Sequence, residues 1–81
     1  MIPTGEQLRA ARALLRIEQR DVAEAAGVSL ETIKRLEGIK GPVSANAATV
    51  EKIIKALEAA GAVFIPENGE GPGVRTRKPL G

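Results

Sequence analysis

The sequence contains no cysteine and no histidine, and its one aromatic residue is a phenylalanine. Without cysteine the chain can form neither a disulfide framework nor a thiolate metal site, and without histidine it lacks the commonest general base and the commonest zinc ligand. Asp21 is the only aspartate, and Ser29 and Ser44 are the only serines, so no nucleophile–base pair is visible. We therefore expect no enzyme activity, no metal site and no cofactor.

Long apolar runs are also missing, because none approaches the roughly 18 residues that a membrane span needs. Residues 1–6 lack the charged and apolar regions of a signal peptide, so we expect a cytoplasmic protein without a membrane partner. The 12 lysines and arginines exceed the 10 acidic residues, which gives a formal net charge of +2. This balance is compatible with a polyanionic partner but does not identify one.

Residues 4–61 show the apolar spacing and the terminal residues of four helices. Threonine, serine and asparagine side chains can accept a hydrogen bond from a free N–H of a first helical turn, and glycine is suited to the turn after a helix. The predicted helices run from Thr4 to about residues 14–16, from Gln19 to Ala26, from Leu30 to Glu37 and from Ala47 to Ala60, with N-caps at Thr4, Ser29 and Asn46 and glycine stops at Gly27, Gly38 and Gly61.

Residues 62–81 lose this helical spacing. Ala62–Ile65 is a short apolar run, residues 67–73 are dense in turn formers, and Val74–Arg77 alternates in polarity. The pattern predicts a β-hairpin, followed by a frayed end at Lys78–Gly81. The expected fold class is mainly α: a compact four-helix domain over residues 1–61, with a C-terminal β-hairpin and tail over residues 62–81.

Four residues around the second and third predicted helices stand at the offsets that two short, closely packed helices need. Ala23 is small where the helices touch, Gly27 suits the tight turn, and Ile33 and Leu36 are apolar residues inside the following helix. The combined spacing, Ala-x3-Gly-x5-Ile-x2-Leu, is much more specific than any one of these residues.

At these positions the sequence resembles the lambda-repressor-like, or xenobiotic-response-element, family of helix-turn-helix DNA-binding proteins. The resemblance covers about residues 5–60 and is strongest in Gln19–Ser29 and Ile33–Gly38. It implies a compact helical domain whose third helix lies in the major groove of double-stranded DNA. It also implies an ion pair between Arg12 and Glu37.

The resemblance further implies a sequence-specific transcription regulator of the Cro-like, repressor-like kind, which binds its operator as a homodimer. The sequence departs from the family at Glu18, where members usually have Ser, Thr or Asn. It departs again at Leu30 and Glu31, where members often have glutamines. The operator sequence therefore cannot be transferred from the family.

The third predicted helix carries the residues that we expect to contact bases. With Ile33 and Leu36 pointing inward, helical geometry turns the polar side outward. Arg35 can donate two hydrogen bonds to guanine, and Glu31 can accept one from the amino group of cytosine. The expected base contacts are Ser29, Leu30, Glu31, Lys34 and Arg35. Taken singly, these side chains have plainer explanations, such as a solvated face or a charge that stabilises the helix N-terminus.

Phosphate contacts are expected from residues on both sides of this helix, and they would make binding depend on salt. They are Gln19, Arg20, Thr32, Lys40 and Gly41, together with backbone N–H groups of Gly38–Gly41 and the N-terminus of the fourth helix. For Gln19 the role comes from the family resemblance, and its plainer explanation is that of a residue that begins a helix. Arg75, Arg77 and Lys78 either add flanking phosphate contacts or keep the surface soluble.

An isolated two-stranded hairpin is marginally stable in water, so the predicted hairpin must pack on something. We expect it to form the dimer interface through Val63, Phe64, Ile65 and Val74. The alternative is a hairpin that covers the core of its own chain. A second candidate function, a protein-interaction module such as an antitoxin or an anti-regulator, would use the same strand to hold another protein.

Overall fold

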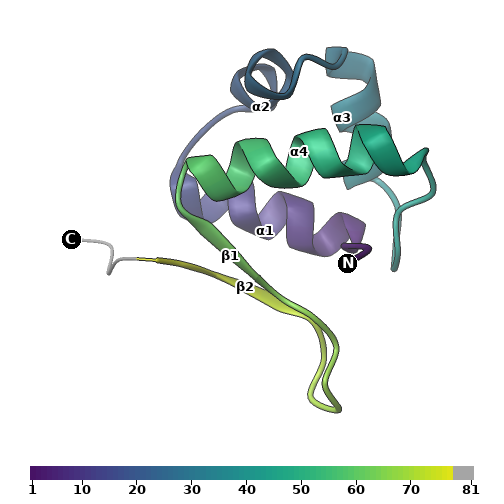
Figure 1. Ribbon diagram of the computed structural model, residues 1–81, viewed down its shortest axis with the longest axis vertical. Coiled ribbons are helices and arrows are strands. Elements are labelled where there is room, and N and C mark those ends of the chain that lie inside the picture. The colour runs from purple at the N-terminus through teal and green to yellow at the C-terminus, as the bar shows by residue number, and fades with distance from the viewer. Residues whose placement is uncertain (78–81) are drawn as a thin grey trace.

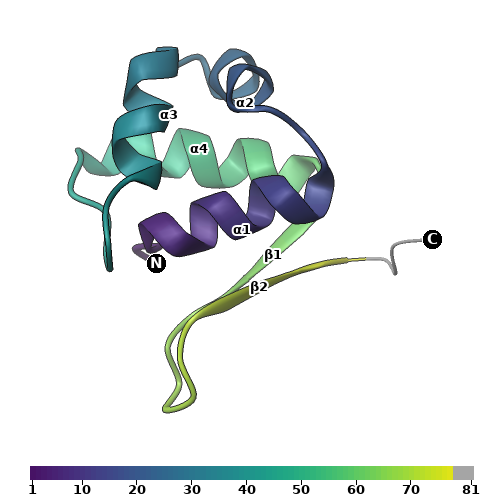
Figure 2. The same cartoon turned by 180° about the vertical axis from the view of Figure 1, so that it is seen from behind.

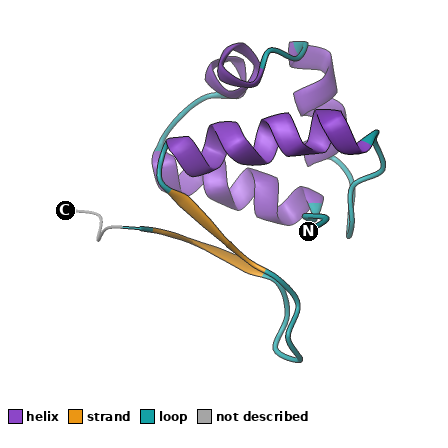
Figure 3. Ribbon diagram, viewed as in Figure 1, coloured by secondary structure: helices purple, strands orange, loops and turns teal. Residues whose placement is uncertain are grey.

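The computed structural model describes residues 1–77 of the chain, and its elements match the predicted fold class of four helices and a C-terminal hairpin. In Figures 1 and 2, α2 lies above α1 and α4, α3 runs from the top of the molecule down past α4, and the hairpin lies below the helices. Figure 3 shows the same separation of helices from strands. The elements are α1 (Gly5–Leu15), α2 (Gln19–Ala26), α3 (Leu30–Glu37), α4 (Ala47–Ala59), β1 (Ala62–Ile65) and β2 (Gly73–Thr76). The frayed end predicted for Lys78–Gly81 lies outside the described residues.

The helices begin where side chains cap their free N–H groups, and the three predicted N-caps are confirmed. The cap distances are 2.9 Å from Gln7 N to Thr4 Oγ1, 3.1 Å from Thr32 N to Ser29 Oγ and 2.8 Å from Thr49 N to Asn46 Oδ1. At the start of α2, the Glu18 N–H donates to the Asp21 carboxylate at 2.8 Å. This bond satisfies the N–H of the N-cap residue, whereas the family's usual Ser, Thr or Asn would accept an N–H from the first helical turn.

Two helices end at left-handed residues. Gly27, after α2, has φ 69°, as the sequence predicted. Arg16, after α1, has φ 58° and is the one non-glycine residue with positive φ among residues 1–77. The fourth helix ends at Ala59, one residue earlier than expected, and Ala60 is its C-cap.

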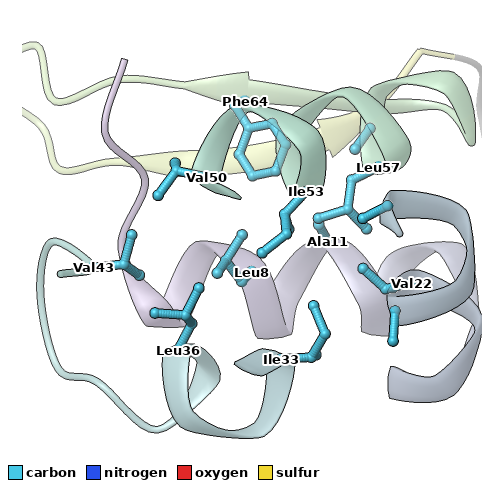
Figure 4. Packing of buried hydrophobic residues seen from close by; sticks show 13 residues of the cluster. Leu8, Ala11, Val22, Ile33, Leu36, Val43, Val50, Ile53, Leu57 and Phe64 are labelled. Carbon is cyan, nitrogen blue, oxygen red and sulfur yellow. The ribbon is translucent and has the colours of Figure 1, made fainter. Parts of the chain in front are cut away.

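The hydrophobic core lies between the helices and the inner face of the hairpin (Figure 4). Leu36, Ile53 and Leu57 are among its most completely buried side chains. The full cluster consists of Leu8, Ala11, Val22, Ala23, Ala26, Ile33, Leu36, Val43, Val50, Ile53, Leu57, Ala62 and Phe64. Because every helix and β1 contribute to it, α3 is fixed in position by the whole domain.

The hairpin is antiparallel, with Phe64 opposite Val74 and Val63 opposite Arg75. Phe64, 9% exposed, belongs to the chain's own core, and Val74 packs against that core. Because side chains alternate along a strand, Val63 and Ile65 lie on the other face, where they are half-buried. Phe64 and Val74 thus cover their own domain, and the interface expected through all four residues stays a prediction.

The N-terminal end of α1 lies against the loop that follows α3. The Gly5 N–H donates to the Gly41 carbonyl at 3.0 Å, and the Val43 N–H donates to the Pro3 carbonyl at 3.0 Å. Gly5 is buried, and a side chain there would collide with the carbonyl groups at the end of α3. No local sequence pattern indicated this close approach. Among the described residues, no helix is long and apolar enough to cross a membrane.

Candidate nucleic-acid interface

The predicted contact between α2 and α3 is formed. Ala23, Ile33 and Leu36 are all buried, and the Val28 N–H closes the turn by donating to the Ala23 carbonyl at 3.0 Å. Gly27 takes the left-handed conformation that the turn requires. The small residue, the turn glycine and the two apolar residues thus play the structural roles that their spacing predicted.

The side of α3 away from the core carries Glu31, Lys34 and Arg35, all of them exposed. We refer to these three residues as the outer face of α3. Helical geometry explains the division, because Ile33 and Leu36 direct the opposite side into the core. The chain therefore presents one negative and two positive side chains on a helix that is rigidly packed from behind.

Ser29 is the N-cap of this helix, and Thr32 lies in its first turn. The Ser29 hydroxyl caps α3 and also lies 2.8 Å from the Thr32 hydroxyl. Leu30 is half-buried and packs partly against the core, so only part of its side chain is on the surface.

Arg35 has a partner within the chain. Its Nη1 donates to the Ser44 carbonyl oxygen at 3.2 Å, which turns the exposed guanidinium toward the loop between α3 and α4. No local sequence signal pointed to this contact, because it depends on the path of the loop. The hydrogen bond limits where the guanidinium can lie. It uses one N–H of the guanidinium, which has others that can donate.

The ion pair predicted between Arg12 and Glu37 is confirmed. Arg12 Nε lies 2.7 Å from Glu37 Oε2, and Nη2 lies 3.0 Å from Oε1, so the pair is bidentate. Hydrogen bonding to the carboxylate raises the pKa of the Arg12 guanidinium. Arg9 donates to the Glu37 backbone carbonyl. Together these contacts fasten the C-terminal end of α3 to α1.

Gln19 joins the same network, since its Nε2 donates to Glu37 Oε1 at 3.1 Å. This bond fixes the side chain at the start of α2 and leaves one amide proton and the amide oxygen uncommitted. Arg20 and Lys40 are exposed, and Thr32 is half-buried. The structure thus gives Gln19 a structural partner that the sequence alone did not suggest.

The backbone N–H groups expected to meet phosphate are largely occupied. The Gly38 N–H bonds within α3, and the Ile39 N–H donates to the Leu36 carbonyl. The Gly41 N–H donates to Glu6 Oε1 at 3.0 Å, and this hydrogen bond lowers the pKa of the Glu6 carboxyl. A phosphate contact from the Gly41 amide stays a prediction, and it requires the Glu6 carboxylate to leave this N–H.

Gln7 is a further residue that the sequence did not single out. Only 4% exposed, it uses its side-chain amide to contact both strands of the hairpin. The pattern Thr4-x-x-Gln7 is a capping-box signature, and that signal was available from the sequence. Its contact with the hairpin was not, because the residues involved are 58 and 66 positions apart.

Comparison with known protein families agrees with this geometry. Residues 4–64 match a family model described as a helix-turn-helix domain. The matched range includes all four helices and reaches Phe64 in β1. No curated protein matches the chain.

Proposed function

The chain belongs to the helix-turn-helix domain family, and from this membership we propose that it is a sequence-specific, repressor-like regulator of transcription that inserts α3 into the major groove of double-stranded DNA. The observation that carries the proposal is the outer face of α3, which is exposed while the rest of the helix is fixed by the core and by Glu37. An α-helix fits the major groove, where each base pair presents a distinct pattern of donors and acceptors.

Within this proposal Arg35 and Glu31 provide most of the specificity. To bind guanine through two hydrogen bonds, Arg35 leaves the Ser44 carbonyl or shares its donors with it. Giving up one such bond costs about 0.5–1.5 kcal/mol, whereas a good bidentate base contact contributes about 1–3 kcal/mol of discrimination. The exchange is therefore favourable at the correct base. Lys34 reaches a neighbouring base, while Ser29 and the exposed part of Leu30 meet the groove at the first turn.

Phosphate contacts in the proposed complex come from Gln19, Arg20, Thr32 and Lys40. Gln19 suits this role because its bond to Glu37 orients the amide before DNA arrives. Arg20, in α2, and Lys40, in the loop after α3, supply exposed positive charge. These contacts fix the register of the helix on the duplex and make affinity fall as salt rises.

We further propose that the protein binds as a homodimer through the outer face of the hairpin. Val63 and Ile65 support this role because they lie on the face that does not cover the core. A two-fold dimer would place two copies of α3 about one helical turn, roughly 34 Å, apart on the same side of the duplex. In this proposal residues 1–61 form the DNA-binding domain, and residues 62–81 form the segment that joins two copies.

Selection of bound duplexes from random DNA tests the proposed function. We expect enrichment of a two-fold symmetric site, and we expect Arg35→Ala to lose roughly tenfold to hundredfold in discrimination between that site and a scrambled one. Lys52→Ala, an exposed change of the same charge on α4, is the matched control and should keep both affinity and selectivity. The assignment is wrong if Arg35→Ala selects as sharply as the wild type.

The outer face of the hairpin also favours a second candidate, the protein-interaction module, because Val63 and Ile65 could add to a partner's apolar surface. The same selection separates the two functions. A protein that enriches no DNA sequence and binds no duplex at low salt would be the interaction module, and one that enriches a site would be the regulator.

A further inference from the structure

Gln7 uses both ends of its buried side-chain amide. Its Nε2 donates to the Ile65 carbonyl at 3.0 Å and to the Gly73 carbonyl at 2.8 Å. Ile65 and Gly73 face one another at the end of the hairpin ladder nearest its loop. Its Oε1 accepts the Thr4 N–H at 2.9 Å. One side chain therefore ties the first turn of α1 to both strands of the hairpin at once.

The same turn of α1 is fastened to the loop that follows α3. Gly5 donates to the Gly41 carbonyl, and Glu6 accepts the Gly41 N–H. The backbone at Gly5 also approaches the carbonyl oxygens of Leu36 and Ile39 too closely to admit a side chain. The first turn of α1 thus stands between the end of α3 and the hairpin, and it makes short contacts in both directions.

We infer that Gln7 is a positioning residue that fixes the angle between the hairpin and α3. In the dimer this angle sets the distance between the two copies of α3, so the inference rests on the proposed function. A short two-stranded hairpin is marginally stable alone and cannot keep a fixed angle by its own ladder. Phe64 and Val74 hold the middle of the hairpin on the core, and the Gln7 amide holds the end that lies away from α4.

Two substitutions separate this role from helix capping. In Gln7→Glu the carboxylate still accepts the Thr4 N–H, but it has no N–H for the hairpin and lies against two carbonyl oxygens. In Thr4→Ala the cap acceptor for Gln7 N is lost while both hairpin bonds remain. Gln7→Met is a second variant without donors, in case the buried carboxylate prevents folding. Binding and circular dichroism are both measured at one alkaline pH, where the new carboxyl is ionised and has no proton to donate, and the circular dichroism establishes that each variant is folded.

The experiment measures binding to duplexes that carry either one half-site or two half-sites at stepped separations. The wild type should prefer one separation by about tenfold over its neighbours. Gln7→Glu and Gln7→Met should bind a single half-site as the wild type does but distinguish separations by at most about threefold. Thr4→Ala should keep the wild-type preference.

Two results would overturn the inference: an unchanged preference in the Gln7 variants, or an equal loss of affinity for single and paired half-sites, which would mean a merely structural role. Failure of the proposed function looks different, because the wild type would then bind no half-site. A wild type that binds single half-sites without any preferred separation would refute the dimer and this inference while leaving α3 as the DNA-binding element.

Discussion

At Gly5 the chain has no room for a side chain. A Cβ there would lie 2.8 Å from the Leu36 carbonyl oxygen and still closer to that of Ile39, and both of these atoms belong to backbone. Neither can move without shifting the end of α3. The requirement for glycine at this position comes from two segments that meet in space, so it left no trace in the local sequence.

We predict that Gly5→Ala lowers the free energy of unfolding by about 3 kcal/mol, because overpacking against backbone forces the two helices apart. Urea unfolding measures the change. Gly27→Ala is the matched comparison: a Cβ there meets nothing within 4 Å, so only its positive φ resists the substitution. Its loss should be about 1 kcal/mol. Equal losses at the two positions would contradict the close approach.

Arg16 is a non-glycine residue in the left-handed conformation, with φ 58°, where its Cβ causes steric strain. We predict that Arg16→Gly raises the free energy of unfolding by about 1 kcal/mol, because glycine adopts this conformation without the steric cost that other residues bear. Arg16→Ala removes the same charge and keeps the strain, so it should bring no gain. Thermal unfolding of the glycine and alanine variants measures both changes. A stabilised alanine variant would show that the gain comes from removing the charge and not from relieving the backbone strain.

At the scale of elements, the sequence predicted where helices begin, because hydrogen bonds between neighbouring residues determine this. The caps at Thr4, Ser29 and Asn46 bond to groups three residues ahead, so each can be recognised from a short stretch. The contacts that orient the elements are of another kind. Gln7 to the hairpin and Arg35 to Ser44 depend on the paths of distant segments, and no local pattern encodes them. Arg12–Glu37 was found because the family resemblance supplied the long-range partner.

Glu6 links two elements in a way that depends on pH. Its carboxylate accepts the Gly41 N–H, which lowers its pKa in the folded chain below the ordinary 4.5. The stability that it contributes is therefore present above the ordinary pKa and is lost as pH falls through the lower, folded value.

We predict that Glu6→Gln is less stable than the wild type at neutral pH and that the difference shrinks as pH falls below about 4.5. Urea unfolding midpoints at stepped pH supply the comparison. Glutamine can still accept the Gly41 N–H, so the change isolates the charge. A difference that stays constant through the acidic range would refute the link between this carboxylate and the loop after α3.

At the scale of the whole molecule, the two faces of the hairpin differ: one packs on the core of its own chain, and the other does not. Phe64 and Val74 complete the core of their own chain, so removing the hairpin would expose that core. Val63 and Ile65 take no part in it, and they are the residues through which we propose that a second copy binds. The sequence indicated the apolar character of this segment but not the division between its faces, which follows from the register of the strands.

We predict that sedimentation equilibrium shows a dimer for the wild type and a monomer for the double variant Val63→Glu, Ile65→Glu. The carboxylate introduced at position 63 lies opposite Arg75, and such a cross-strand pair supports the hairpin while removing apolar surface. Thermal unfolding of the monomeric variant should therefore differ little from that of the wild type diluted until it is monomeric. A double variant that still dimerises would move the interface away from the hairpin.

We propose that the outer face of α3 lies in the major groove, and methylation of a selected duplex by dimethyl sulfate tests this placement most directly. This reagent modifies guanine N7, which lies in the major groove, and adenine N3, which lies in the minor groove. The wild type should protect guanine N7 in two patches about one helical turn apart, and Arg35→Ala should leave one guanine in each patch unprotected. Protection confined to adenine N3, or guanine protection that is the same in wild type and Arg35→Ala, would contradict the account.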